Sequence, residues 1–248
     1  EKKYIDKNAF GAADYIINLA GAGVADKQKK KKRKQEIVDS RVNSSQLIVD
    51  SLKTIPNKVK AVVSASAIGW YGADPMVPNP KPFEENDPAN EAFLGNTCKL
   101  WEESIEPVTL SGIRLVKLRI GIVLSKYGGA LSEFKKPLQV GIAAILGNGK
   151  QIISWIHIDD LVRMFITAIE SSTMNGEYNA VAPAPVSNKE LTIQLAKSRK
   201  QFFIPFYVQP QLATVRVRFY SASAMSDIPV ADATGTLTRY ILPLDGSQ

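Results

Sequence analysis

Two small hydroxyl residues follow an apolar run in the first third of the chain. The run is Ala61 to Val63, Ser64 and Ser66 come next, and Trp70-Tyr71-Gly72 closes the segment. An apolar run without alternation predicts a strand that is buried on both faces, as in a parallel sheet. Open α/β sheets bind their ligands at the carboxyl ends of such strands, so both hydroxyls are candidates for ligand contact. The alternative interpretation is a buried strand that ends in an ordinary turn.

A second β-rich run ends at a turn of small residues. The run is DYIINL, from Asp14 to Leu19, and Ala20-Gly21-Ala22-Gly23 follow it. Glycine lets another molecule approach the backbone closely. The pattern therefore predicts a strand followed by a glycine turn.

His157 is the single histidine of the chain and lies in the apolar segment IISWIHI. No second histidine, cysteine or acidic pattern accompanies it, so we expect no metal site. Period-two alternation places Trp155 and His157 on one side of a strand. Asp159 and Asp160 follow, and we interpret them as the acidic start of a helix.

The net charge of +7 comes largely from one basic run, residues 27–34. Such a run could bind nucleic acid or anionic lipid. It contains no aromatic residues on which single-stranded bases would stack. We therefore interpret it as a solvated helix start and expect no nucleic-acid partner.

Other bulk features favour a cytoplasmic location. Cys98 is the single cysteine, which excludes an internal disulfide and fits a reducing compartment. No apolar run is long enough to cross a membrane, and the charged start EKKYIDKNAF does not resemble a signal peptide. We expect no membrane partner.

Strand-like and helix-like segments alternate along the 248 residues, a length that suits one large α/β domain or a domain with a small lobe. The expected strands are 14–19, 61–66, 115–124, 152–158 and 178–181. The expected helices are 33–52, 91–105, 131–145 with interruptions at Pro137 and Gly141, 159–170, and 191–197 after a capping box at Ser187 and Glu190. A proline-containing loop is expected at 75–90. The alternation implies parallel pairing and a doubly wound sheet.

The end of the chain has a different pattern. Residues 215–220 alternate like an antiparallel or edge strand, and residues 221–248 cannot be placed from their pattern.

Several segments together resemble the extended short-chain dehydrogenase/reductase superfamily. They are DYIINLAG, SASAIGWYG, LRIGIVL, SWIHIDDLVRMFITAIE and GEYNAVAP. A closer resemblance is to its atypical NAD-dependent epimerase/dehydratase-like family, through NLAGAGVADK, RKQEIVDSRVNSS, SASAIGWYG, FLGNTCKLWEE, RIGIVLSKYGGAL and SWIHIDDL. The segments occur in the order of the family and cover roughly residues 4 to 205. The resemblance implies an α/β, Rossmann-like doubly wound parallel sheet with a small C-terminal substrate lobe.

The resemblance also implies two regions and shows two departures. Residues 1–150 would form the remainder of an NADP-binding domain, and residues 151–248 the last Rossmann elements plus the substrate lobe. The superfamily begins with a strand, a TGxxGxxG turn and a helix that hold the pyrophosphate, and nothing here matches them. We therefore expect the first βαβ unit to be missing from this chain. After Phe206 the chain does not resemble the family's helical lobe.

The cofactor implied by the resemblance is a nicotinamide dinucleotide. The implied contact residues are Asn18, Ala20, Gly21 and Ala22 along adenosine, Ser64 and Ala65 under nicotinamide, and Ile122 and Val123 beside the carboxamide. Lys27 and Arg41 could meet a 2′-phosphate, which favours NADP over NAD.

Catalysis in the superfamily uses a Tyr as general acid or base, a Lys four residues later that lowers the Tyr pKa, and a Ser or Thr that holds the substrate oxygen. Lys99 matches the Lys, but the Tyr position falls on Gly95, as it commonly does in this atypical family. Lys99 could contact the nicotinamide ribose or be a solvated helix residue. Tyr71 is the nearest alternative phenol, as a proton donor or as a packing or substrate contact.

Ser66 aligns best with the catalytic Ser or Thr, and Ser64 is second. Either residue could instead cap the turn. The resemblance places Trp155 and His157 near the substrate, although a lone histidine in a strand is more often structural.

The function that the resemblance implies is an NADP-dependent oxidoreductase or nucleotide-sugar epimerase-like protein. Ser66 and Lys99 would assist hydride transfer between nicotinamide and a hydroxyl-bearing carbon. The alternative is an NADP(H)-binding regulatory protein with little or no turnover, which the missing Tyr and glycine-rich turn favour. The expected partner is a small molecule such as a nucleotide sugar, and a homodimer is an open alternative for the assembly.

Overall fold

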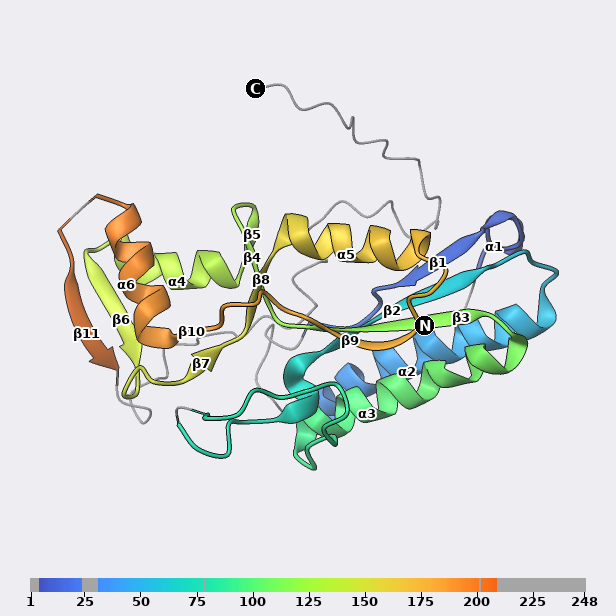
Figure 1. Cartoon of the computed structure of the whole chain (residues 1–248), viewed down its shortest axis with the longest axis horizontal. Helices are drawn as coiled ribbons and strands as arrows, with labels where there is room; N and C mark the ends of the chain where they lie inside the picture. The colour runs from blue at the N-terminus through green and yellow to red at the C-terminus, as the bar shows by residue number, and fades with distance from the viewer. Residues whose placement is uncertain (1–4, 24–30, 78, 201, 209–248) are drawn as a thin grey trace, which may run out of the picture.

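The computed structural model describes residues 5–23, 31–77, 79–200 and 202–208, and Figure 1 shows their arrangement. Lys27, a predicted cofactor contact, and the strand expected at 215–220 lie outside the described residues. Within the described ranges, no helix combines the length and the apolar composition that crossing a bilayer requires.

The core of the fold is a four-stranded parallel sheet in the order β1-β2-β3-β9. Its strands are β1 (Tyr15–Asn18), β2 (Ala61–Ala67), β3 (Arg114–Ile120) and β9 (Gly176–Ala180). Every residue of β2 is buried, as the apolar run in the sequence predicts. The register aligns Asn18 with Ser64 and Ser64 with Lys117, so the carboxyl ends of β1 and β2 lie side by side. The predicted α/β class with parallel strands is confirmed.

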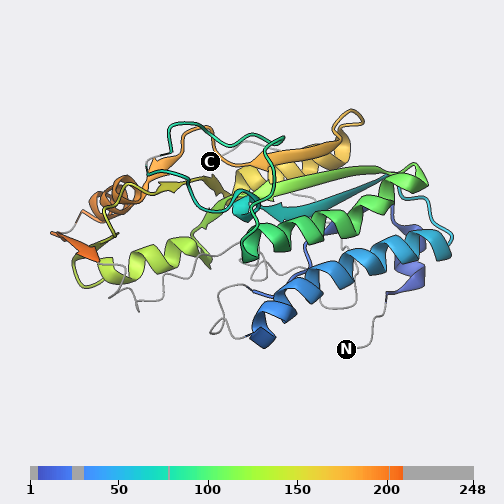
Figure 2. The same ribbon diagram turned by 90° about the horizontal axis from the view of Figure 1, so that it is seen from below.

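Helices cover both faces of this sheet, as Figures 1 and 2 show. Helices α2 (Lys31–Thr54) and α3 (Phe93–Ile105) lie on one face, and α5 (Ile158–Glu170) lies on the other. Side chains from alternate positions of β2 enter two different apolar clusters, Val62 beside α2 and α3 and Val63 beside α5. This alternation is what a strand covered on both faces requires. A short helix that the sequence pattern did not predict, α1 (Lys7–Ala12), precedes β1 and begins at the N-cap Asp6.

Smaller elements form a second region beyond the central sheet (Figure 1). They comprise three small sheets, β5-β4-β8, β10-β7 and β11-β6, with helices α4 and α6. Their bounds are β4 (Ile122–Ser125), β5 (Gly128–Gly129), α4 (Ala130–Leu138), β6 (Ile142–Leu146), β7 (Ile152–Ile153), β8 (Trp155–His157), β10 (Val186–Ser187), α6 (Asn188–Ser198) and β11 (Ile204–Val208). Because β6 pairs with β11, this region contains residues from both sides of the boundary expected at residue 150.

In two segments a glycine explains the difference from the sequence prediction. The strand expected at 115–124 is divided at Gly121, where an added Cβ would lie 2.6 Å from the Ser154 carbonyl oxygen. The chain leaves the central sheet at this close approach. The helix expected at 131–145 ends at Leu138, and Gly141, with φ +76°, turns the chain into β6. Pairing with β11 then outweighs the helical spacing of the sequence.

The segment expected as one strand at 152–158 forms the two short strands β7 and β8, which belong to different sheets. His157 ends β8 and is the N-cap of α5. The predicted capping box is present: Ser187 and Glu190 bond each other's backbone N–H groups at the start of α6.

Candidate functional site

The carboxyl ends of β1 and β2 are joined by buried side chains. Asn18 donates from Nδ2 to the hydroxyls of Ser64 at 3.3 Å and Ser45 at 3.2 Å. Both residues are almost fully buried, Asn18 at 2% and Ser64 at 1% exposure, and the hydrogen bond between them holds the two strand ends together. The more exposed surface here comes from the next residues along the chain, above all Ala20.

Arg41 of α2 supports the turn after β1. Its Nη1 donates to the carbonyl oxygens of Ala22 at 3.1 Å and Ile37 at 3.0 Å, and its guanidinium lies 4.9 Å from the centre of the Trp101 ring. Burial lowers the pKa of Arg41. An added Cβ at Gly21 would approach this guanidinium to 3.0 Å. Arg41 is therefore bound to the backbone of the turn, and its contact with a 2′-phosphate stays a prediction.

Ser66 belongs to a buried ionic network at the end of β2. Its hydroxyl donates to Oε1 of Glu102, on α3, at 2.6 Å. Arg119, on β3, donates to the same carboxylate from Nε at 2.9 Å and from Nη2 at 3.0 Å. Three elements thus meet at one carboxylate that is 5% exposed. A role of Ser66 in holding substrate stays a prediction; in this structure its proton is directed to Glu102.

Tyr71 lies at the end of the short 3-10 helix η1 (Ile68–Tyr71), which follows β2. Its hydroxyl accepts a hydrogen bond from Nη1 of Arg119 at 3.1 Å and donates to Oδ1 of Asn179 at 2.7 Å. Burial raises the pKa of Tyr71, and the Arg119 guanidinium offsets part of that effect. The phenol is therefore protonated at neutral pH, which suits a proton donor better than a base.

The superfamily's Tyr position, Gly95, is closed by the backbone of the preceding loop. An added Cβ at Gly95 would lie 2.1 Å from the carbonyl oxygen of Asn90. No side chain fits there unless the loop moves. Lys99, one turn further along α3, has a 53% exposed side chain that lies 3.8 Å from Glu103. The structure does not bring Lys99 into the network of Ser66 and Tyr71 hydrogen bonds.

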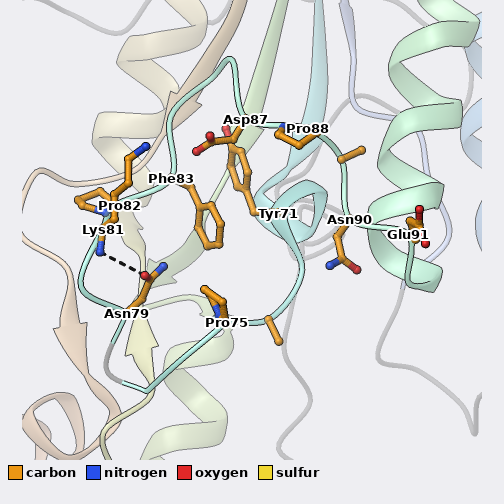
Figure 3. A pocket seen from close by; sticks show the side chains of 12 residues that line it. Tyr71, Pro75, Asn79, Lys81, Pro82, Phe83, Asp87, Pro88, Asn90 and Glu91 are labelled. Carbon is orange, nitrogen blue, oxygen red and sulfur yellow. Dashed lines mark hydrogen bonds between the residues drawn. The ribbon is translucent and has the colours of Figure 1, made fainter.

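A cavity of about 590 Å³ opens beside Tyr71. Figure 3 shows the side chains that line it. Its walls are Tyr71 and the loop between η1 and α3. The lining residues are Tyr71, Ala73, Pro75, Asn79, Lys81, Pro82, Phe83, Asp87, Pro88, Ala89, Asn90 and Glu91. The Phe83 ring stacks on Tyr71, with 5.0 Å between centroids and 10° between ring planes.

Sequence reasoning treated this segment only as a proline-containing loop and so missed the cavity. The available signal was an aromatic residue, Phe83, within a loop that prolines restrict.

The predicted nicotinamide and substrate segments lie together in one small sheet. Strand β4 pairs in parallel with β8, which places Ile122 beside Trp155 and Val123 beside Ile156. The Trp155 indole N–H donates to the Ala184 carbonyl at 3.0 Å, and His157 is 48% exposed while its Nδ1 accepts from the Asp159 backbone N–H. Substrate contact by Trp155 and His157 stays a prediction. The described residues contain no cluster of His, Cys, Asp and Glu that could hold a metal ion.

Comparison with known proteins places this arrangement in a family. The model of the NAD dependent epimerase/dehydratase family matches residues 5–180. A curated relative, epimerase family protein Mb2239 of Mycobacterium bovis, is 34% identical over 198 residues, which cover 80% of this chain and 64% of the relative. The chain spans between 53% and 64% of the length of the first curated relatives that it matches.

Solved structures share the fold. The human epimerase family protein SDR39U1, in a crystal structure with NADPH, is 24% identical, has a TM-score of 0.75, and is matched over 87% of this chain and 76% of its own. The nucleoside-diphosphate sugar epimerase of Corynebacterium glutamicum is 25% identical with a TM-score of 0.67, over 90% of this chain and 50% of its own. With its parallel sheet and the family match over residues 5–180, this chain belongs to the NAD dependent epimerase/dehydratase family.

Proposed function

We propose that this chain forms part of an NADP(H)-dependent oxidoreductase or nucleotide-sugar epimerase-like protein. The observation that carries the proposal is the alignment of strand ends: β1, β2 and β3 are adjacent and parallel, and the small-residue turn Ala20–Gly23 follows the first of them. Ligands of open α/β sheets bind at that edge. Two similar proteins support this proposal: the human protein was crystallised with NADPH, and the Corynebacterium glutamicum protein is named a nucleoside-diphosphate sugar epimerase.

The residues at this edge fit the two nucleosides of a dinucleotide. The turn after β1 offers a backbone surface for adenosine at Ala20, Gly21 and Ala22. Gly21 has no side chain, and Arg41 fills the space in which a larger side chain at this position would lie. Ile122 offers an apolar contact for nicotinamide. When bound, nicotinamide supplies the hydride acceptor or donor. A 2′-phosphate that contacted Arg41 would compete with its bond to the Ala22 carbonyl.

Tyr71 is the phenol best placed to supply a proton. Its hydroxyl accepts a hydrogen bond from Arg119, and a cation at this distance stabilises the phenolate that forms when the proton leaves. The same residue is among those that line the cavity, and its hydroxyl proton is bonded to Asn179, so a substrate would have to replace Asn179 as the acceptor to receive it. Under this proposal Tyr71 takes the part that the superfamily assigns to the Tyr missing at Gly95.

The alternative proposal is dinucleotide binding with little or no turnover. Three observations favour it: the closed space above Gly95, the engagement of the Ser66 hydroxyl by Glu102, and the exposure of Lys99. In this structure the superfamily's Tyr is therefore missing, its Ser hydroxyl is bonded to a buried carboxylate, and its Lys side chain does not join the hydrogen bonds of Ser66 and Tyr71.

Titration of the chain with NADPH and then NADH, followed by nicotinamide fluorescence, tests both proposals. We expect NADPH to bind at micromolar concentration and about tenfold more tightly than NADH, the factor that one charge-assisted contact provides. The NADPH-loaded chain is then challenged with a panel of carbonyl compounds, which can accept the hydride, and the NADP⁺-loaded chain with UDP-glucose, whose conversion to its 4-epimer is measured directly. NADPH consumption supports the oxidoreductase, and epimer formation without net cofactor consumption supports the epimerase. Binding with neither supports the regulatory alternative, and no binding of either dinucleotide contradicts both proposals.

A further inference from the structure

Arg119 uses nearly all of its hydrogen-bonding capacity inside the protein. Its Nε and Nη2 bind the Glu102 carboxylate in a bidentate pair, and both side chains are buried, at 3% and 6% exposure. A buried pair of this kind contributes little net stability, because desolvation offsets the attraction. What the pair does provide is a fixed position for the remaining nitrogen, Nη1.

That nitrogen binds Tyr71, which lines the cavity, and Glu85, which belongs to the loop that forms the rest of the cavity wall. Nη1 of Arg119 donates to the Tyr71 hydroxyl at 3.1 Å and to the Glu85 carbonyl oxygen at 2.8 Å. Tyr71 in turn donates to the Asn179 side chain, and the Asn179 backbone N–H donates to the Glu85 carboxylate at 2.8 Å. The four residues close a ring of hydrogen bonds that ties the loop to strands β3 and β9.

The other face of the guanidinium holds the same loop through Trp70. Cζ of Arg119 lies 3.7 Å from the centre of the Trp70 ring. The Trp70 indole N–H donates to the Asp87 carbonyl at 2.9 Å, and the Asn90 backbone N–H donates to the Trp70 carbonyl at 2.7 Å. The loop is therefore attached at residues 85, 87 and 90, and each attachment reaches Arg119 directly or through one aromatic residue.

We infer that Arg119 is a positioning residue, which fixes the wall of the cavity formed by Tyr71, Phe83 and the loop to Asn90 without itself lining the cavity. Arg119 is absent from the cavity lining, whereas Tyr71 and Asn90 belong to it. The inference deepens the proposed function, since it concerns the same cavity, but its test requires neither cofactor nor turnover.

Hydrogen exchange of the backbone amides, measured by NMR on the whole chain, tests the inference. Asn90 and Asn179 report the loop attachments, and amides of β2 report the core. In Arg119→Lys the charge stays but the forked donor is lost, so we expect the two reporter amides to exchange about tenfold faster, the factor that one hydrogen bond from a charged donor provides. Core amides should keep their relative protection.

Arg114→Lys is the matched control, because Arg114 lies on the same strand and also binds carbonyl oxygens, but at the end of α5 and in the segment that follows it. Tyr71→Phe keeps the stacked ring and removes the hydroxyl, and it should accelerate exchange at the same two amides to a smaller extent. It also provides a test if Arg119→Lys does not fold. Reporter exchange that rises only in proportion to core exchange, as in the control, would overturn the inference.

Discussion

Replacement of Gly95 by alanine tests whether the loop closes the superfamily's Tyr position. In a helix interior alanine is favoured over glycine by about 1 kcal/mol, so α3 alone should become more stable. The added Cβ, however, would lie 2.1 Å from the Asn90 carbonyl oxygen, far inside van der Waals contact. Overpacking of this kind costs about 1–3 kcal/mol after the backbone relaxes. Subtracting the propensity gain from this cost leaves an expected net loss of about 0–2 kcal/mol in the free energy of unfolding.

The assay is chemical denaturation together with the melting temperature. For a chain of this size a loss of up to about 2 kcal/mol lowers Tm by up to about 8 °C. Asn96→Ala is the control, because Asn96 is the next residue of α3, is exposed, and gains helix propensity without a clash. If Gly95→Ala is as stable as Asn96→Ala, the loop yields freely. The backbone clash that closes position 95 would then be absent, and the steric argument for Tyr71 would be refuted.

Three further predictions follow from the described contacts. Arg114→Ala removes the guanidinium that binds the Ala168 and Ile169 carbonyls at the end of α5 and the Met174 carbonyl beyond it, so urea unfolding should show a loss of about 2–3 kcal/mol. Lys117 is buried between Glu106 and Glu177. Burial alone would lower the pKa of Lys117, but the two carboxylates outweigh that effect and raise it. Burial alone would raise the pKa of Glu177, but the Lys117 ammonium outweighs that effect and lowers it. The native chain should therefore be more stable than Glu177→Gln above the ordinary carboxyl pKa of 4.5. This stability difference should be lost as pH falls through the lowered pKa of Glu177 in the folded chain. It should also be lost as pH rises through the raised pKa of Lys117. Burial raises the pKa of Cys98 to about 12, so a disulfide reagent at pH 8 should modify it only after unfolding.

The parts of the fold that the sequence predicted are those with a strong local pattern. The unbroken apolar run at β2, the helical spacing in α2 and the capping box of α6 each determine their own element. The predictions that were wrong concern segments whose structure depends on contacts with residues distant in the sequence. Gly121 ends a strand because the Ser154 carbonyl lies against it, and residues 142–146 pair with β11, which follows nearly sixty residues later in the chain. Neither contact leaves a local signal in the sequence.

The candidate site shows the same division. Family motifs selected Ser66 and Tyr71, which the structure joins through Arg119. Reasoning from motifs did not select Arg119, Glu102 or Asn179, because each has its role only through side chains from other elements. An arginine within an apolar strand pattern, as at position 119 in LRIGIVL, is the signal that could have revealed a buried ionic network, since such a charge requires a partner.

The loop between η1 and α3 connects the two departures from the superfamily's chemistry. Its carbonyl at Asn90 occupies the space above Gly95, and its attachment at Glu85 depends on the same guanidinium that pairs with Glu102, the acceptor of the Ser66 proton. A chain that regained a Tyr at position 95 would have to displace the loop at Asn90, and with it one side of the cavity. Restoring the missing phenol alone should therefore not restore the superfamily's proton transfer. The variant Gly95→Tyr is expected to lose the cavity wall and to gain no NADPH consumption over the native chain.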